Sequence, residues 1–166
     1  QDNELLKERL SKLEERLRDE SVKLSTKSRY AVQAMVDLAK NNSDKPCNLT
    51  DISIRQNISL SYLEQIFNKL KKSNLVFSIK GPGGGYNLSK APNKIKISEI
   101  INGVEENIKA TGCSNDPSKF CTGKNEKCIT HHFLEDLESL IENYLDSVAL
   151  SDIALNKENN FLGLNQ

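Results

Sequence analysis

Apolar residues recur at intervals of three and four over several stretches of this chain, which is the spacing of helices that bury one face. The pattern predicts helices over residues 4–20, 27–41 and 49–57, a longer helix after Ser59, a short helix that ends at Val104, a long helix over 132–148 and a final helical turn at 151–155. Ser25 and Thr26 can cap the helix over 27–41, and Ser98 is expected to cap the short helix. Two short alternating runs, 75–80 and 86–89, flank the glycine-rich turn 81–85 and predict a β-hairpin. The pattern therefore indicates a mainly α fold with one small β-hairpin.

The segment 49–70 has the order of a helix-turn-helix motif, namely a short helix, a tight turn and a longer helix. Asn57 suits a left-handed end of the first helix, and Ile54 is expected on that helix's inward face. The outer face of the second helix, near its start, carries hydrogen-bonding side chains that could enter a major groove: Ser59, Ser61, Tyr62, Glu64 and Gln65. An ordinary helical hairpin with a polar outer face would show the same pattern.

The β-hairpin favours the DNA-binding alternative, because a hairpin directly after a helix-turn-helix is a wing. Lys80, at the tip, would reach a phosphate or the minor groove, and the glycines after it let the backbone approach DNA closely. The glycine-rich turn is not a nucleotide-binding loop, because no Gly-Lys-Ser/Thr follows it and a strand comes next.

The charged residues cancel over the whole chain but are unevenly distributed. Counted as Lys and Arg against Asp and Glu, residues 1–21 sum to −2, residues 22–96 to +9 and residues 97–166 to −7. A basic block of this kind can neutralise a phosphate backbone. A lysine-rich solvated surface is the alternative, and charge alone does not decide between them.

The stretch from Cys113 to His131 holds three of the four cysteines and one of the two histidines. The residues between them are mostly loop formers, so disulfides or bound metal must order the segment. Three thiols cannot all pair with one another, whereas Cys113, Cys121, Cys128 and His131 offer four donors to a metal centre. Structural or fortuitous thiols are the alternative. The lone Cys47 is expected to be a small, partly buried apolar residue.

No run of about 18 apolar residues and no apolar N-terminal segment is visible, so we expect neither a membrane span nor a secretory signal. Cysteine-rich loops without a signal point to the reducing cytoplasm and to metal rather than disulfides. The apolar stripe of helix 132–148 needs a partner that this chain supplies only in part. A second copy is the natural candidate, and packing within the same chain is the alternative.

These patterns suggest a division of the chain into five parts. They are an N-terminal amphipathic helical extension of native or appended origin (1–21), a winged helix-turn-helix domain (22–96), a short helix with the ligand loop (97–131), a dimerisation helix with the final helical turn (132–156) and a flexible tail (157–166).

Four strings of residues carry a resemblance to a known family: 24–31 (LSTKSRYA), 58–65 (ISLSYLEQ), 81–86 (GPGGGY) and Cys128-x2-His131. Through them, residues 23–155 resemble the dimeric winged-helix repressors that include the iron–sulfur cluster assembly regulators. The cysteine loop is the feature that separates these regulators from family members without a cluster. Residues 1–21 lie outside the resemblance.

The resemblance implies a [2Fe–2S] cluster held by Cys113, Cys121, Cys128 and His131, delivered by cluster donors. It also implies a homodimer on palindromic promoter DNA, with cluster occupancy selecting between operator classes. The position of Glu64 would disfavour one operator class unless the cluster-bound form rearranges it. The residues expected at the DNA are Arg29, Ser59, Ser61, Tyr62, Glu64, Gln65, Lys80, Gly81, Pro82 and Gly83.

Two departures from the family pattern stand out. The gaps between the ligand cysteines, seven and six residues, are longer than usual in the family, which loops tolerate at small cost. Lys80 replaces the usual arginine of the wing and lacks its bidentate fork. Because the ligand loop has little apolar surface, we expect bound iron to supply the free energy that orders it and to reposition the recognition helices. A neutral histidine ligand should make the cluster easier to lose.

The expected function is therefore a DNA-binding transcriptional regulator that senses [2Fe–2S] cluster status and controls iron–sulfur cluster biogenesis genes. One alternative is a winged-helix regulator with a structural zinc ion, although zinc favours short Cys-x2–4-Cys knuckles that are absent here. A regulator whose cluster senses nitric oxide or redox state is another. A redox enzyme or a cluster-transfer scaffold is disfavoured, because the sequence has no Cys-x-x-Cys, nucleophile–base pair or nucleotide motif.

Overall fold

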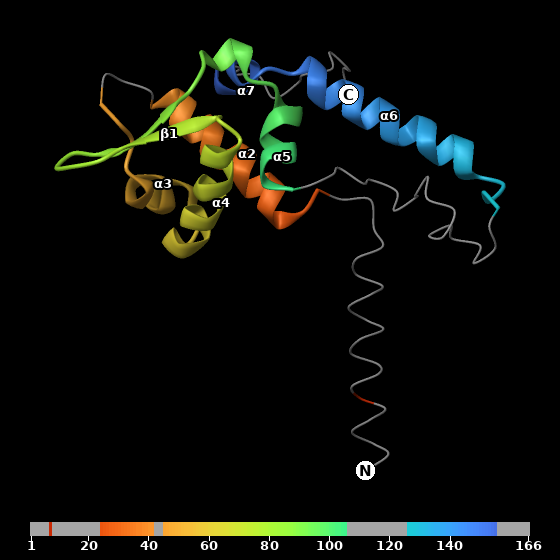
Figure 1. Ribbon diagram of the computed structural model, residues 1–166, viewed down its shortest axis with the longest axis horizontal. Coiled ribbons are helices and arrows are strands. Elements are labelled where there is room, and N and C mark those ends of the chain that lie inside the picture. Colours follow the sequence, from red (N-terminus) through yellow and green to blue (C-terminus); the bar gives the residue numbers. More distant parts are fainter. Residues whose placement is uncertain (1–6, 8–23, 42–44, 106–125, 156–166) are drawn as a thin grey trace, which may run out of the picture. The chain divides into compact units, whose positions relative to one another are not determined.

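The computed structural model describes residues 24–41, 45–105 and 126–155, together with Lys7. Its helices and strands are α2 (Thr26–Lys40), α3 (Leu49–Gln56), α4 (Leu60–Lys72), β1 (Val76–Ile79), β2 (Gly85–Leu88), the 3-10 helix η1 (Pro92–Lys94), α5 (Ile97–Val104), α6 (His131–Ser147) and α7 (Leu150–Leu155) (Figure 1). The chain divides into two units, one formed by Gln1–Leu24 and Lys109–Ile141 and the other by Ser25–Ile108 and Glu142–Gln166. Each is described by itself.

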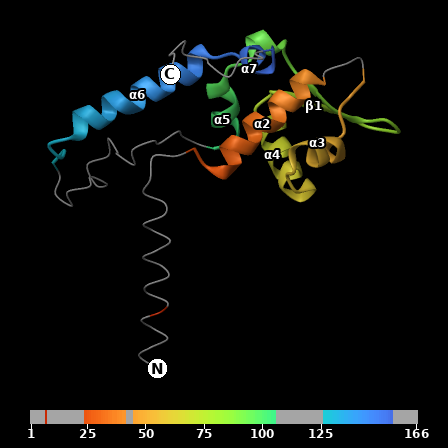
Figure 2. The same cartoon turned by 180° about the vertical axis from the view of Figure 1, so that it is seen from behind.

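The second unit has one apolar core, to which α2, α4, α5 and α7 all contribute. The large side chains that are fully buried include Met35, Leu38, Leu63, Phe67, Ile100, Ile101 and Leu150. Figures 1 and 2 show α2, α4 and α5 side by side around this core. Burying one large apolar side chain contributes about 1.5–3 kcal/mol, so the core fixes α4 firmly against its neighbours.

The predicted helix-turn-helix is confirmed in its geometry. Asn48 caps α3 by accepting a hydrogen bond from the Thr50 N–H at 2.9 Å. Asn57 ends α3 in the left-handed conformation, with φ of 53°, and the adjacent Ile58 is buried. The inward placement expected for Ile54 is wrong, because its side chain is 76 % exposed.

The start of α5 differs from the sequence prediction. Ser98 was expected to cap this helix, but the helix begins at Ile97 with Lys96 at its N-terminal cap. The Glu99 carboxylate accepts the Lys96 N–H at 2.9 Å, as the N3 residue of a capping box does. Ser98 is buried inside the first turn and donates to the Asp146 carboxylate at 2.9 Å, so it joins α5 to the end of α6.

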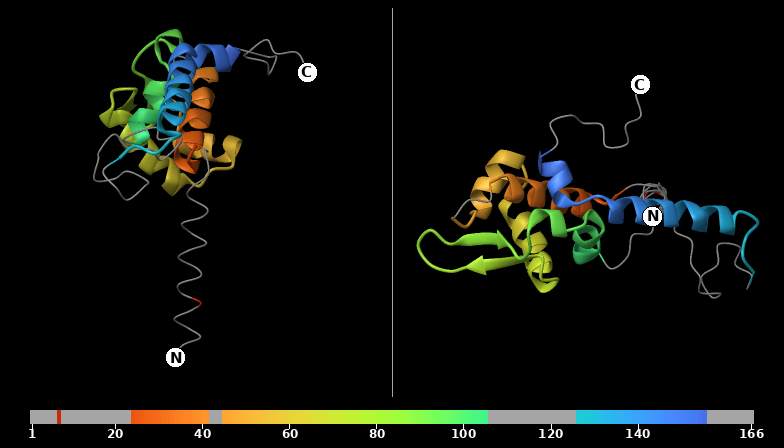
Figure 3. Two further views of the ribbon diagram at one scale, coloured as in Figure 1. Left: turned by 90° about the vertical axis from the view of Figure 1, so that its right-hand side faces the viewer. Right: turned by 90° about the horizontal axis from the view of Figure 1, so that it is seen from above.

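The predicted hairpin is present as an antiparallel pair in which Val76 lies opposite Leu88 and Ile79 opposite Gly85. Its strand β2 is joined to the linker between α2 and α3 close to the turn, because Cys47 and Tyr86, the second residue of β2, exchange backbone hydrogen bonds of 3.0 and 2.8 Å. The hairpin tip extends away from the helices (Figure 3). A Cβ added to Gly85 would lie 2.4 Å from the Cys47 carbonyl oxygen, so only glycine fits this crossing.

The mainly α fold with one small hairpin is therefore confirmed. Helices α2, α6 and α7 each begin one residue earlier than the pattern predicted. The helix expected over 4–20 lies outside the described residues, apart from Lys7. Within the described part of the chain, none of the helices combines the length and apolar character needed to cross a membrane.

Candidate nucleic-acid interface and metal ligands

The first turns of α4 carry the side chains expected to read DNA. Ser59 stands at the N-terminal cap position, and Ser61, Glu64 and Gln65 are exposed. Tyr62 is half-buried, with its ring edge-on to Tyr30 of α2 at a centroid distance of 5.8 Å. Hydroxyl, carboxylate and amide groups at the exposed start of a helix are the groups that read base edges in a major groove.

The opposite face of α4 is anchored in the core. Leu63, Phe67 and Leu70 are fully buried, and the Phe67 ring packs against Tyr86 of the wing at 4.9 Å between centroids. On the exposed side, Lys71 donates to the Ser78 hydroxyl of β1 at 2.6 Å. The helix that carries the side chains expected to read DNA and the strand that leads to the wing tip are thus held together.

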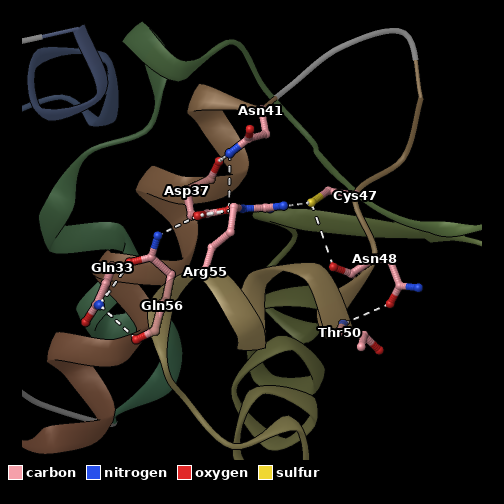
Figure 4. Close-up of polar contacts among 8 residues, drawn as sticks. All are labelled: Gln33, Asp37, Asn41, Cys47, Asn48, Thr50, Arg55 and Gln56. Atoms are coloured by element: carbon pink, nitrogen blue, oxygen red, sulfur yellow. Dashed lines mark hydrogen bonds and ion pairs between the residues drawn. The ribbon is translucent and has the colours of Figure 1, made fainter.

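A polar network between α2 and α3 was not predicted from the sequence (Figure 4). The Asp37 carboxylate, only 3 % exposed, accepts hydrogen bonds from Arg55 at 2.6 and 3.1 Å, from Gln56 at 2.5 Å and from Asn41 at 3.3 Å. Arg55 also donates to the Cys47 thiol at 3.3 Å. The signal was present: Asp37 lies between apolar positions on α2, where a buried acid requires a cationic partner.

This environment shifts the pKa values of both partners. Burial alone raises the pKa of Asp37, but the hydrogen bonds from Arg55 and Gln56 and the Arg55 charge outweigh it, so the pKa lies below its ordinary value. The hydrogen bond to Asp37, followed by the contact with Cys47, raises the pKa of Arg55. Both groups are therefore charged at neutral pH, and the ion pair fixes α3 against α2.

The remaining residues expected at the DNA are exposed. Arg29 lies near the start of α2, and Lys80, Gly81, Pro82 and Gly83 form the wing tip. Gly81 and Gly83 have φ of 109° and 76°, which an L side chain rarely adopts. The Gly84 N–H closes the turn by donating to the Gly81 carbonyl at 2.9 Å.

The described residues hold two of the four expected cluster ligands, and they lie in adjoining positions. The His131 N–H donates to the Cys128 carbonyl at 3.0 Å, where α6 begins. Cys128 is half-buried, its sulfur is 3.5 Å from the Thr130 hydroxyl, and His131 is 3 % exposed. Cys113 and Cys121 lie outside the described residues, within which three metal-binding side chains do not come together.

The thiol and imidazole fit a single metal centre by their chemistry. Both are soft-to-borderline donors, and a backbone hydrogen bond holds their main chains in one turn. Glu135 lies 4.0 Å from His131 and 3.6 Å from His132, on the following turn of α6. A carboxylate behind a histidine ligand commonly fixes the orientation of its ring.

A helix-turn-helix with an exposed polar reading face, followed by a wing, defines a DNA-binding transcriptional regulator of the winged-helix class. Residues 24–156 match the Rrf2 family, described as an iron-dependent transcriptional regulator, and the chain belongs to this family. Like its named relatives, which are regulators, this protein is a transcriptional regulator and not an enzyme.

Similar proteins support this assignment along most of the chain. The transcriptional regulator IscR of Pectobacterium atrosepticum is 44 % identical over 137 residues, covering 82 % of each chain, and IscR of Escherichia coli O1:K1 is also 44 % identical, covering 82 % of this chain and 83 % of that one. The solved structure of T. potens IscR matches with a TM-score of 0.67 and 35 % identity, covering 86 % of this chain and 93 % of that one. CymR, the global cysteine regulator of B. subtilis, matches with a TM-score of 0.69 and 32 % identity, covering 82 % and 98 %.

Proposed function

We propose that this protein is a homodimeric regulator that senses the supply of iron–sulfur clusters through a bound [2Fe–2S] cluster and controls the genes that make them. The observation that carries the proposal is the joint presence, in one chain, of an exposed polar helix start on α4 and of Cys128 and His131 within one backbone turn at the start of α6. The likeness to proteins named IscR supports it. Because promoters are its target, its place of action would be the cytoplasm.

The cluster would be held by Cys113, Cys121, Cys128 and His131. Three thiolates and an imidazole suit iron–sulfur chemistry, and a histidine ligand makes the centre more easily lost than a fourth thiolate would. When bound, the cluster would supply the free energy that orders the ligand loop. The chain's own contribution is to hold Cys128 and His131 in one turn through their backbone hydrogen bond.

On the DNA side, α4 would lie in a major groove and the wing along the adjacent phosphates. Ser59, Ser61, Tyr62 and Gln65 would contact bases or phosphates, and Glu64 would disfavour one operator class. Arg29, Lys80 and the glycines of the wing tip would contact the backbone. The basic excess of residues 22–96 supports this orientation, because the same region carries both the recognition helix and the wing.

The dimer would form along α6. Phe133 and Leu140 are 69 % and 67 % exposed, and they lie seven residues apart on one side of this helix. Tyr144 follows four residues later and borders a small groove of about 90 Å³ that Ile97 and Leu145 also line. An apolar stripe of this length is suited to a second copy related by a two-fold axis.

The test combines spectroscopy with DNA binding. Protein purified without oxygen should be coloured, contain about two iron and two sulfide ions per chain, as [2Fe–2S] chemistry requires, and prefer different operators with and without the cluster. A colourless protein that contains one zinc ion would favour the structural-zinc alternative. Operator binding that does not change when the cluster is removed would leave a plain repressor. Loss of DNA binding only after nitric oxide treatment would favour a nitric-oxide sensor.

The donors that deliver the cluster would be partners of this protein. A scaffold that merely passes clusters on would retain cluster transfer after the reading helix is altered. We expect instead that changes at Tyr62 and Gln65 abolish operator binding while the cluster content stays the same.

A further inference from the structure

The last turn of α5 is held by side chains of the recognition helix. The Lys69 ammonium of α4 donates to the Val104 carbonyl at 3.0 Å. The hydroxyl of Ser73, the C-terminal cap residue of α4, donates to the Gly103 carbonyl at 3.2 Å. These carbonyls belong to the last turn of an α-helix, where they lack intrahelical partners and carry partial negative charge. Lys69 therefore supplies the positive charge that suits this helix end.

The segment that ends α4 also packs tightly against Gly103 of α5. A Cβ added to Gly103 would lie 3.2 Å from both the Ser73 hydroxyl and a Leu75 methyl group. Val104 and Leu75 are buried on the two sides of this contact. Because close-packed groups cannot slide freely past one another, a shift of the last turn of α5 would have to move the end of α4.

The residue after this turn is tied to a second element. Glu105, at the C-terminal cap of α5, accepts a hydrogen bond from the hydroxyl of Ser25, which caps the start of α2. The following residues, 106–112, connect Glu105 to Cys113, the first of the four ligands proposed above. The segment that enters the ligand loop thus starts from a point fixed to both α2 and α4.

We propose that Lys69 and Ser73 are positioning residues that couple the ligand loop to DNA reading by holding the end of α5 against α4. This inference rests on the proposed cluster-sensing function. When the cluster binds its ligands, the pull on Glu105 shifts the last turn of α5. Lys69 and Ser73 pass that shift to α4, which carries the reading residues at its other end. Lys71 passes it on to β1 of the wing through Ser78.

Lys69→Met tests the coupling, because it keeps the length of the side chain and removes the donor. Operators are first selected from random DNA with cluster-loaded and with cluster-free wild-type protein, at one salt concentration. For each form of the protein, a dissociation constant is measured for each of the two selected operators. The ratio of these two constants measures operator preference. Allosteric couplings commonly change affinity about 5–150-fold, so loss of the cluster should change the wild-type ratio at least about tenfold. In Lys69→Met, the change should fall below about threefold.

Three variants and two further readouts separate coupling from simple stabilisation. Lys72→Met removes the same charge from the same turn and should keep the wild-type change in the ratio. Lys69→Arg keeps a donor and should restore it, and Ser73→Ala provides the same test if Lys69→Met does not fold. Iron and sulfide content, and the affinity of cluster-free protein for its operator, should stay within about twofold of wild type.

The outcomes are distinguishable. If the cluster-dependent change of the ratio persists in full in both Lys69→Met and Ser73→Ala, the contacts only stabilise the fold and the inference fails, while the proposed function stands. If wild-type protein shows no cluster-dependent change, the proposed function fails and the inference fails with it. Loss of the change in Lys69→Met but not in Lys72→Met supports both.

Discussion

Replacement of Arg55 by methionine should weaken the packing of α3 against α2 and lower the free energy of unfolding, while the apolar core stays intact. The change removes three hydrogen bonds to Asp37, at 2.6, 3.1 and 3.1 Å, and leaves a buried carboxylate. Breaking a fully buried ion pair by removing one partner costs about 3–5 kcal/mol. The Arg55 side chain is 37 % exposed, and Gln56 and Asn41 still donate to Asp37. We therefore expect a loss of about 2 kcal/mol in the free energy of unfolding, within the usual range for a charge-assisted hydrogen-bonded pair.

The measurement is urea unfolding of cluster-free protein at pH 7 and fixed protein concentration, followed by circular dichroism. The double variant Asp37→Asn with Arg55→Met is the control. Because both changes disrupt the same pair, their costs should not add, and the interaction energy should be about 1–2 kcal/mol. A loss below about 0.5 kcal/mol for Arg55→Met, which is the range of ordinary surface changes, would refute the reasoning, as would strict additivity.

The pH dependence gives a second check. The pKa of Asp37 is lower in the folded protein than its ordinary value of 3.8. The unfolded chain therefore binds the proton more readily, and the ion pair contributes fully above the unfolded pKa. Its contribution is lost as the pH falls through the folded pKa of Asp37. The stability difference between wild type and Arg55→Met should accordingly shrink in acid, below about pH 4.

Three further predictions concern the wing and the proposed dimer. Lys80→Ala should weaken binding to all operators alike and reduce the salt dependence of log K by about one ion, as expected for one phosphate contact; equal salt slopes would place Lys80 away from DNA. Leu140→Asp, which puts a charge on the exposed apolar stripe of α6, should convert dimers to monomers in sedimentation experiments with little change in helix content, whereas an unchanged dimer would require another interface. Gly85→Ala should lower the free energy of unfolding, measured by thermal unfolding, by about 2–4 kcal/mol, because its Cβ would lie 2.4 Å from the Cys47 carbonyl oxygen. A loss near zero would show that the linker between α2 and α3 moves to make room.

Local patterns predicted the elements of this fold well because most of them depend on neighbouring residues. The left-handed Asn57 and the capping Ser25 act within their own turns, and both were expected. Ile54 was placed wrongly because α3 has only two turns, and its inward face is already filled by Leu49 and Ile52. A helix of two turns has too few positions for periodicity to show whether a third apolar side chain faces the core.

The contacts that sequence reasoning missed are those between distant segments. Ser98 is a residue type that often caps helices, but its hydroxyl donates a hydrogen bond to Asp146, 48 residues further along the chain. Arg55 and Asp37 are 18 residues apart, and nothing in the spacing pairs them until α2 and α3 are packed. The expected ligand set is local in sequence, but Cys113 and Cys121 fall outside the described residues, so it stays a prediction.

The bridge between Cys47 and Tyr86 has a consequence for how such regulators diversify. It fixes the start of β2 to the linker between α2 and α3, while the tip residues 80–83 are exposed and take no part in the core. Changes of length or charge at the tip can therefore accumulate during evolution without refolding the domain. The same arrangement makes the tip a suitable place for grafting loops from related proteins to alter which promoters are bound.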